Sequence, residues 1–443
     1  MLDMWMPIAM VLLLFAGILS GYPVALVLGG VAAMFLLISD LPMAFSNLML
    51  TRVYANAINN WLYVAIPMFI MMGLLLERTG LARDAFRVSE RLLRKLPGHL
   101  ALTVLFIGGV MAATTGVVGA SVVLLAVLAL PRMLESGYSA PESAGLISAS
   151  GTLAILMPPS VMLIILSSLV SVPVGHLFKA ALVPSGLLLL LYMLYSLGRV
   201  LWQQRSSQLS TLSQYVEEPE NESMWRSLLA LFPFLVLIPI VLGTIVFGVA
   251  TPTEASGVGV LAVLGFATLM GKIDSSSVIT AARETVVSTA MIMMLVITAT
   301  CFSLIFKGVG GDNLIRSSLN LMGGGSWSVL ILILLLVFLL GFFLDWMEIS
   351  LILMPIFVPI VSQLELSNGL AGGSLLVWFA ILFAINLQTS FLTPPFGVSL
   401  FYLKGAVGDR IATLDIYRGV LPFIAIQLFV LILILCFPRL LML

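Results

Sequence analysis

The sequence predicts an all-α polytopic membrane protein, built as an inverted repeat with two re-entrant helical hairpins and two broken helices. Three observations support this fold class: its composition, its recurrent apolar segments and two proline-rich breaks. The 443 residues are 61% hydrophobic and 9% charged, with a mean hydropathy of +1.19. An ordinary soluble domain carries about a quarter charged residues, so this chain cannot cover a water-facing surface.

Segments of about 20 apolar residues, long enough to cross a bilayer, fall into two halves. In the first half, 1–202, the candidates are 5–20, 23–38, 61–77, 100–131, 143–170 and 179–200. In the second half, 227–443, they are 228–248, 254–271, 286–306, 326–361, 374–401 and 419–437. Between the halves, 203–226 is rich in Gln, Ser and Glu, which predicts a cytoplasmic linker.

Prolines and a serine occur in the same order and at similar spacing in the two halves, which indicates an internal repeat. The pairs are Pro23 and Pro252, 229 residues apart, Ser121 and Ser350, also 229 apart, and Pro158-Pro159 and Pro394-Pro395, 236 apart.

The distribution of Lys and Arg predicts the orientation in the membrane. Basic residues gather at 78–99, in the linker, at 272–283 and at 404–418. If all four regions are cytoplasmic, 100–131 and 326–361 must each enter and leave on one side, as re-entrant hairpins. The first then opens to the cytoplasm and the second to the opposite face, and both termini are periplasmic.

A stretch at 81–97 has amphipathic helical spacing. It predicts either an interfacial helix that holds a moving domain in place or a basic loop that follows the positive-inside rule. The motif Thr251-Pro-Thr-Glu254 is a different signal, because a hydroxyl residue, a proline and a glutamate in this order are typical of a helix start.

Each predicted broken helix carries a proline pair among small polar residues, at 148–160 and at 386–397. Proline lacks an N–H and blocks the carbonyl four residues earlier, so two in a row break a helix. In lipid, such a break is tolerated only where protein or a water-filled cavity satisfies the backbone. One break in each half indicates a transporter binding site near the bilayer midplane.

The first hairpin gathers glycines and hydroxyl residues at 108–121, opposite the break at 148–160. Hydroxyl and carbonyl oxygens are ligands suited to a dehydrated Na⁺, although close packing of helices by small residues also explains such a run. In the second hairpin, Asp345 and Glu348 interrupt an apolar stretch. Charges are expensive there, and the two acids could hold a cation, position a proton or cap the turn.

Several classes of function are disfavoured. The net charge is zero, which gives no indication of a nucleic-acid partner. The sequence has no Walker-type phosphate loop and no His-Glu-x-x-His motif, so an enzyme is the weaker class. Cys301 and Cys436 lie in apolar runs far apart, as expected of buried packing thiols.

Four stretches resemble the large membrane (M) subunit of tripartite ATP-independent periplasmic (TRAP) transporters, and the resemblance covers essentially the whole chain. They are Ser150-Gly-Thr-Leu-Ala-Ile-Leu-Met-Pro-Pro-Ser160, Thr251-Pro-Thr-Glu-Ala255, Asp345-Trp-Met-Glu-Ile-Ser350 with Pro355 and Pro359, and Leu392-Thr-Pro-Pro-Phe-Gly397. The resemblance implies an elevator-type transporter in the bacterial inner membrane, with a scaffold and a mobile transport domain. It also implies a small four-helix membrane (Q) subunit, expected as a separate polypeptide, and a periplasmic substrate-binding (P) protein that delivers an organic acid.

The resemblance further implies two Na⁺ sites at the hairpin tips, with no organic cofactor. The residues implied for Na⁺ are Thr115, Gly119, Ser121, Gly151, Leu156 and Pro158 at the first site, and Asp345, Ser350, Gln388, Thr393 and Pro394 at the second. Those implied for the substrate carboxylate are Ser150, Thr152, Thr393 and Gly397.

The expected function is therefore Na⁺-coupled secondary active uptake of an organic acid. A stand-alone Na⁺/dicarboxylate-type carrier is the first alternative, and it would need no binding protein. An intramembrane enzyme that depends on Asp345 is the second, and a scaffold protein that tolerates loss of the polar residues beside both proline pairs is the third.

Overall fold

The computed structural model describes residues 5–39, 41–205, 224–314, 317, 325–366 and 369–441. All regular elements within these ranges are helical. Seven of the described helices are long and apolar enough to cross a membrane, judged by length and composition. The predicted all-α membrane fold is therefore confirmed. Most of the predicted linker 203–226 lies outside the described residues.

The elements follow one another along the two halves of the chain. In the first half they are α1 (Trp5–Leu19), α2 (Val24–Ile38), α3 (Ala44–Val53), η2 (Tyr54–Ile58), η3 (Trp61–Val64), α4 (Ala65–Arg78), α5 (Leu81–Leu93), α6 (His99–Thr115), α7 (Val118–Glu135), α8 (Ala140–Thr152), η4 (Leu153–Ile155), α9 (Val161–Val170) and α10 (Val174–Arg205). In the second half they are α11 (Met224–Val246), α12 (Pro252–Leu269), α13 (Ser275–Gly308), α15 (Ser326–Leu340), α16 (Trp346–Val361), α17 (Gly372–Leu392), α18 (Val398–Val407), η5 (Gly408–Arg410), α19 (Thr413–Cys436) and η6 (Pro438–Leu441).

Capping boxes mark the starts of α8 and α12. The Ser139 hydroxyl accepts a hydrogen bond from the Glu142 N–H, and the Glu142 carboxylate accepts one from the Ser139 N–H. Thr251 and Glu254 make the same reciprocal pair, so the predicted helix start at this motif is confirmed. Each pair satisfies backbone N–H groups that a helix start leaves without partners.

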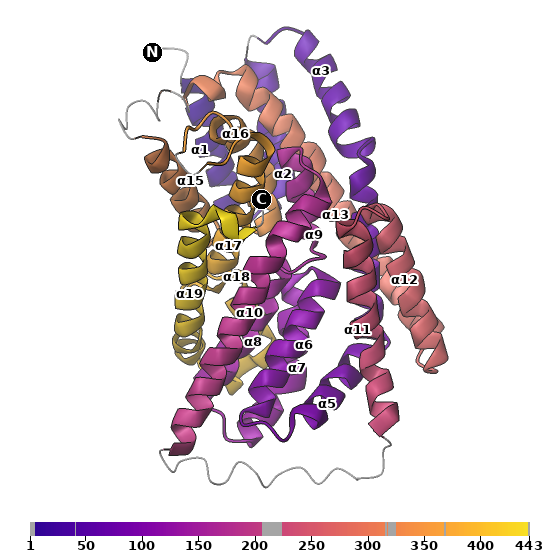
Figure 1. The fold of residues 1–443 in the computed structure, drawn as a ribbon. Coiled ribbons are helices and arrows are strands. Elements are labelled where there is room, and N and C mark those ends of the chain that lie inside the picture. The colour runs from indigo at the N-terminus through magenta and orange to yellow at the C-terminus, as the bar shows by residue number, and fades with distance from the viewer. Residues whose placement is uncertain are drawn as a thin grey trace.

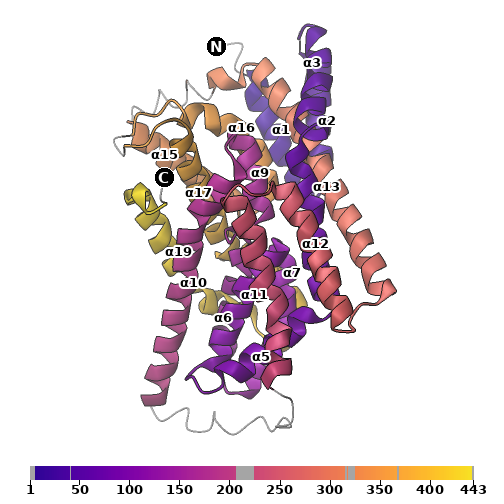
Figure 2. The same ribbon diagram turned by 45° about the vertical axis from the view of Figure 1, so that its right-hand side comes forward.

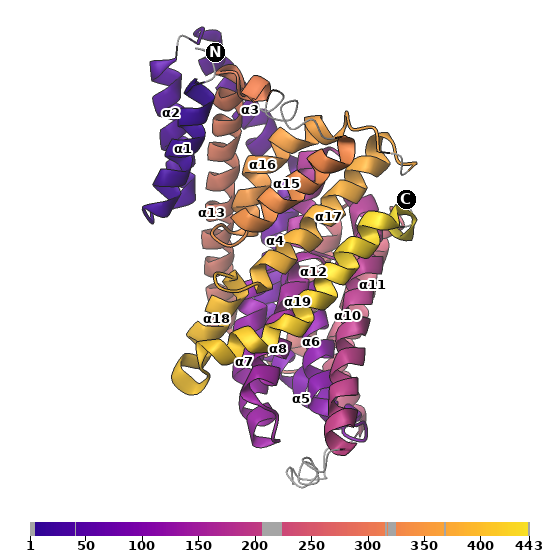
Figure 3. The ribbon, with the colours of Figure 1, turned by 90° about the vertical axis from the view of Figure 1, so that its left-hand side faces the viewer.

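Helices α6 and α7 form one helical hairpin, and α15 and α16 form another. Gly116 turns the first hairpin with a φ of 60°, a conformation that an L side chain rarely adopts. The turn of the second hairpin occupies 341–345. The two hairpins lie at opposite ends of the molecule, and both turns point toward its middle (Figures 1 and 3).

Two sets of described helices, called here groups, each pack among themselves, and they also contact each other where α4 meets α6 and α13 meets α16. In one group, α12 packs on α4 and α11, and α13 packs on α2 and α4. In the other, α8 packs on α6, α7 and α19, while α17 packs on α15 and α19. Figure 2 shows α2, α12 and α13 on one side of the molecule and α10, α17 and α19 on the other.

Helix α5, from the amphipathic stretch 81–97, touches both groups. It packs along α6 of one group and α11 of the other. Asp84 forms an ion pair with Lys272 beside α13, whereas Glu90 forms one with Arg132 of α7. The Arg132 guanidinium also lies 5.6 Å from the centroid of the Phe86 ring. Of the two alternatives for 81–97, this placement fits an interfacial helix that bridges the two groups, and it does not fit a simple basic loop.

Helices α8 and α19 cross with their backbones in direct contact. A Cβ atom at Gly145 would overlap the carbonyl group of Gly419, and one at Gly419 would overlap the carbonyl oxygen of Pro141. Further along, the Gln427 amide reaches Thr152, so the two helices run side by side in the same direction. Small residues at a crossing allow this close approach.

Glu142, which precedes the apolar stretch 143–170, joins the start of α8 to Arg199 of α10. Its carboxylate accepts a hydrogen bond from Arg199 Nε at 3.1 Å and forms an ion pair with the same guanidinium. Burial alone would raise the pKa of Glu142, but Arg199 and Ser139 together hold it below its ordinary value. The stabilisation is therefore complete above the ordinary carboxyl pKa and is lost as the pH falls below it.

We expect acidification from neutral pH to below that value to lower the melting temperature of the wild type more than that of Glu142→Gln. The glutamine has no carboxylate to protonate, so the acid-dependent contribution disappears. Thermal unfolding in detergent at several pH values measures the difference. Arg199→Gln should likewise show a smaller acid-induced drop in melting temperature than the wild type. If the wild type and both variants lose the same number of degrees on acidification, the Glu142–Arg199 ion pair is not the source of the acid-dependent stability.

Candidate functional site

Thr115 and Ser121 tie together the two sides of the first hairpin tip. Their hydroxyl oxygens are 2.9 Å apart, and both side chains are buried. Thr115 has one hydroxyl proton, which it donates to the Met111 carbonyl at 2.9 Å. Ser121 is therefore the donor in the pair, and its own oxygen keeps its lone pairs for a further ligand.

The first hairpin packs directly on the first helix break. A Cβ atom at Gly151 would overlap Val122 of α7, and one at Gly108 of α6 would meet Ser150. The predicted contact between this hairpin and the segment from Gly151 to Pro158 is therefore present. Gly119 is an exception, because it lies against the Tyr402 ring of α18 rather than against the break.

The first break satisfies part of its own backbone. The N–H groups of Leu156 and Met157 both donate to the Leu153 carbonyl, at 3.0 and 2.8 Å. The Ser160 hydroxyl lies 3.1 Å from the Ala154 carbonyl oxygen and 2.9 Å from that of Ile155. The Pro158-Pro159 bond is cis, as is the Pro394-Pro395 bond in the second break. Helical backbone thus stops within the molecule without exposure to lipid.

The Ser150 and Thr152 side chains, which are predicted to bind the substrate, lie inside the protein in this structure. Both are fully buried. Ser150 donates to the Leu146 carbonyl at 2.5 Å, and Thr152 donates to the Ala149 carbonyl at 2.8 Å. Both hydroxyls therefore bond within their own helix and pack against neighbouring helices, and their role toward the substrate stays a prediction.

The second hairpin packs on α17 in a similar way. A Cβ atom at Gly341 would overlap the Ser390 side chain, and Asn386 donates to the Leu334 carbonyl of α15 at 2.7 Å. Ser350 is buried in α16 and donates to the Trp346 carbonyl at 2.6 Å. Positions 386, 387 and 390 of α17 therefore face this hairpin.

The second break is more open than the first. Thr393 and Pro394 are partly exposed, and Pro395 and Phe396 are exposed. The Phe396 ring lies 5.3 Å from the ring of Phe343, which projects from the second hairpin turn. Gly397 is buried, and its N–H donates to the Thr393 carbonyl at 3.0 Å. Thr393 is thus the predicted substrate residue that the structure leaves accessible.

Asp345 and Glu348 form a capping box at the start of α16. Asp345 is the N-cap residue, and its N–H donates to the Glu348 carboxylate at 3.2 Å. The sequence left three roles open for these acids: cation ligand, proton carrier or cap. The contacts seen in the structure are those of a helix cap. Both side chains therefore have a structural function that requires no cation.

Asp345→Asn should retain the stability of the second hairpin, whereas Asp345→Ala should cost about 1 kcal/mol. Asparagine caps a helix as well as aspartate does, but alanine leaves backbone N–H groups without a partner. Thermal unfolding of both variants measures the change in stability. Thr251→Ala, which removes the N-cap of α12, is the matched control. Equal losses for Asn and Ala at position 345 would show that the charge itself matters.

Gln388, which is predicted to bind Na⁺ at the second site, lies away from the second hairpin in this structure. Its side chain points to the face of α17 opposite Asn386, Leu387 and Ser390, and so away from the second hairpin. The Tyr192 hydroxyl of α10 lies close to the side-chain amides of Gln388 and of Gln427 in α19. Sequence periodicity along α17 could not reveal this, because the helix is buried on nearly all sides.

These three side chains, Tyr192, Gln388 and Gln427, are called here the amide cluster. All three are fully buried. The Tyr192 hydroxyl lies near the amides of Gln388 and Gln427, but this hydroxyl, both amide atoms of Gln388 and the amide oxygen of Gln427 form no hydrogen bond of good distance and angle with any described residue. Leaving such a group unsatisfied costs about 1–3 kcal/mol. Tyr192 and Gln427 were missed from the sequence, although an amide in the apolar stretch 419–437 is itself a signal of function.

Tyr402 of α18 lies against the first hairpin tip, on the side of the second. Its ring contacts Gly119 of the first hairpin, and it lies near Asp345 of the second. The side chain is 42% exposed. The structure therefore brings residues of both halves to one central region, as the paired breaks predict.

Comparisons with known proteins agree with this geometry. The family model described as the DctM component of the tripartite ATP-independent periplasmic transporter matches residues 11–440. The isethionate TRAP transporter permease protein DctMQ of Oleidesulfovibrio alaskensis is 28% identical over 93% of this chain, which spans 62% of that protein. The C4-dicarboxylate TRAP transporter large permease protein DctM of Pseudomonas aeruginosa and the ectoine TRAP transporter large permease protein TeaC of Halomonas elongata are each 28% identical, over 85% of this chain and 84% of their own lengths.

Among solved structures, the fold is similar to that of the Alcanivorax borkumensis YdaH transporter. The TM-score is 0.62 at 16% identity, and the match covers 93% of this chain and 95% of the other.

The family match and the permease names of the relatives define a multi-span transporter permease, and the helical membrane fold with its hairpins and breaks agrees with that class. The chain belongs to the DctM component family of tripartite ATP-independent periplasmic transporters, which confirms the predicted relationship to the TRAP large membrane subunit.

Proposed function

We propose that the protein carries out Na⁺-coupled uptake of an organic acid across the bacterial inner membrane. One observation carries the proposal: two hairpin tips enter from opposite ends, and each packs on a helix break that carries a proline pair. Discontinuous helices of this kind provide half-helix ends and unwound carbonyls for ions and substrates.

The cation sites would consist of neutral oxygens. At the first, the Ser121 hydroxyl has free lone pairs, and the carbonyls of Thr115, Gly119, Gly151, Leu156 and Pro158 are the backbone candidates. At the second, the backbone near Ser350 and the backbone around Thr393 and Pro394 are the candidates, with the Gln388 side chain removed from the set. Hydroxyl and carbonyl oxygens suit hard cations such as Na⁺. Each Na⁺ that moves inward gains about 2.3 kcal/mol per 100 mV of membrane potential.

The substrate would bind through its carboxylate near Thr393 and Gly397. Helix α18 starts directly after this break, and a helix N-terminus attracts anions. Relatives named for C4-dicarboxylate, sialic acid and 2,3-diketo-L-gulonate support an acidic substrate. In an elevator mechanism, the group that contains both hairpins would move against the group that contains α2, α4, α12 and α13, with α5 as the frame.

We further propose that a periplasmic substrate-binding protein delivers the substrate and that a small four-helix membrane subunit completes the complex. The test is uptake of radiolabelled organic acids into proteoliposomes that hold this chain and its small subunit. Uptake should require both external Na⁺ and the binding protein. Uptake that persists when choline replaces Na⁺ would overturn the coupling, and uptake without the binding protein would favour a stand-alone carrier.

A further inference from the structure

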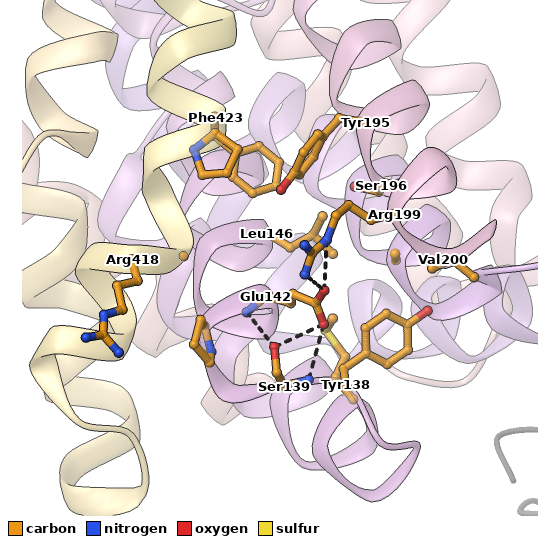
Figure 4. A pocket seen from close by; sticks show the side chains of 15 residues that line it. Tyr138, Ser139, Glu142, Leu146, Tyr195, Ser196, Arg199, Val200, Arg418 and Phe423 are labelled. Carbon is orange, nitrogen blue, oxygen red and sulfur yellow. Dashed lines mark hydrogen bonds and ion pairs between the residues drawn. The ribbon is translucent and has the colours of Figure 1, made fainter. Parts of the chain in front are cut away.

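A cavity of about 270 Å³ opens between α8, α10 and α19, at the end of the molecule where α10 finishes. Figure 4 shows its walls: the ion pair of Glu142 and Arg199 lies in the middle, and the rings of Tyr195 and Phe423 close it above Leu146. The wall includes the buried hydroxyl of Ser196, which forms no hydrogen bond with any described residue. By the distribution of Lys and Arg, this end faces the cytoplasm.

Phe423 separates this cavity from the amide cluster. Its ring makes edge contacts with two tyrosines of α10, at 5.4 Å between centroids for Tyr195, which lines the cavity, and 5.2 Å for Tyr192, which belongs to the cluster. Gln427 follows Phe423 by four residues on α19, which is one helical turn deeper. One aromatic side chain therefore lies between open space and a set of buried polar groups.

Water is the partner that fits the unsatisfied atoms of the amide cluster best. They include the Gln388 amide nitrogen, which can only donate, and the Gln388 and Gln427 amide oxygens, which can only accept. A bare cation would satisfy only the oxygens. Water both donates and accepts, and buried water commonly forms about three hydrogen bonds to such groups.

We propose that the cavity is a cytoplasmic water vestibule and that Phe423 is the gate between it and a hydration site at Tyr192, Gln388 and Gln427. The site extends toward the first break, because the Gln427 amide nitrogen lies 3.5 Å from the Thr152 hydroxyl. Water admitted past Phe423 reaches the buried side of this break. If the proposed Na⁺ coupling holds, on which this step rests, the same water hydrates the cation as it leaves toward the cytoplasm.

Cysteine accessibility tests the gate without any measurement of transport. Cys301 and Cys436 are replaced with alanine, and single cysteines are placed at Ser196 in the cavity and at Gln427 in the cluster. The chain and its partners are kept in membrane vesicles of both orientations, and a cationic, membrane-impermeant methanethiosulfonate is added. Ser196→Cys should react about tenfold faster from the cytoplasmic side than from the periplasmic side.

The gate variant is Phe423→Ala, and its matched control is Phe429→Ala on the exposed face of the same helix. Phe423→Ala should raise the cytoplasmic labelling rate of Gln427→Cys about tenfold, and Phe429→Ala should leave it unchanged. Ser185→Cys, also buried in α10 but away from the cavity, reports general loosening of the fold.

Three results would overturn the proposal: no cytoplasmic labelling of Ser196→Cys, no response of Gln427→Cys to Phe423→Ala, or an equal rise at Ser185→Cys. The labelling requires neither Na⁺ nor substrate. Failure of the gate is therefore distinguishable from failure of Na⁺-coupled uptake.

Discussion

Gly145→Ala is expected to destabilise the protein by about 3 kcal/mol, at the upper end of the usual cost of overpacking a core. The added Cβ atom would overlap the carbonyl group of Gly419, which is backbone and cannot rotate away as a side chain can. Helices α8 and α19 would have to separate along their whole contact. That contact includes the start of the first break and the wall of the cavity between α8, α10 and α19.

Thermal unfolding of the purified protein in detergent measures this loss. Gly419→Ala should behave like Gly145→Ala, because its Cβ atom would overlap the Pro141 carbonyl oxygen. The matched control is Gly186→Ala in α10, where an added Cβ atom meets no atom within 4 Å. If all three variants unfold at the same temperature, the two backbones do not approach as closely as described.

Ser121→Ala is expected to weaken the apparent Na⁺ affinity of uptake by about 10- to 100-fold, the range found when the surroundings of a metal ligand are altered. The Ser121 hydroxyl donates to Thr115, so its lone pairs remain for the proposed cation. Alanine removes this oxygen but leaves the hydrogen bond from Thr115 to Met111 in place. Loss of the bond between Ser121 and Thr115 should cost about 0.5–1.5 kcal/mol, so the hairpin tip should still fold.

The measurement is the Na⁺ concentration that gives half-maximal uptake in proteoliposomes, together with the melting temperature. Ser185→Ala is the matched control, because that hydroxyl is also buried and hydrogen-bonded, to the Ala181 carbonyl, but lies in α10 away from the hairpin tip. An unchanged Na⁺ dependence in Ser121→Ala, with normal folding, would remove this oxygen from the site. Equal losses in both variants would indicate a general packing effect.

The elements that follow local rules could be predicted from the sequence. The broken helix predicted at 143–170 appears as α8, η4 and α9, because Pro158 and Pro159 interrupt helical hydrogen bonding wherever they stand. The second break, after Leu392, has the same local cause. Thr251 and Glu254 predicted the start of α12, because a capping box involves only residues three apart.

The side-chain roles in the site were harder to predict. From the sequence, Asp345 and Glu348 could hold a cation, position a proton or cap the turn, and the cap became clear only when the start of α16 was located between them. Ser150 and Thr152 lie beside the break, but their hydroxyls bond within α8 and their side chains meet other helices. Proximity in sequence to a break does not specify which way a side chain points.

The sequence by itself determined a helical membrane protein with two halves, two hairpins and two breaks, because hydropathy, proline and capping act within a few residues. Only the tertiary structure decided which helix faces meet. Gln388 turns away from the second hairpin and joins Tyr192 and Gln427 from two other helices. In α17, which is buried all round, hydrophobic periodicity does not distinguish one face from another, so the rotation of the helix is set by its packed neighbours.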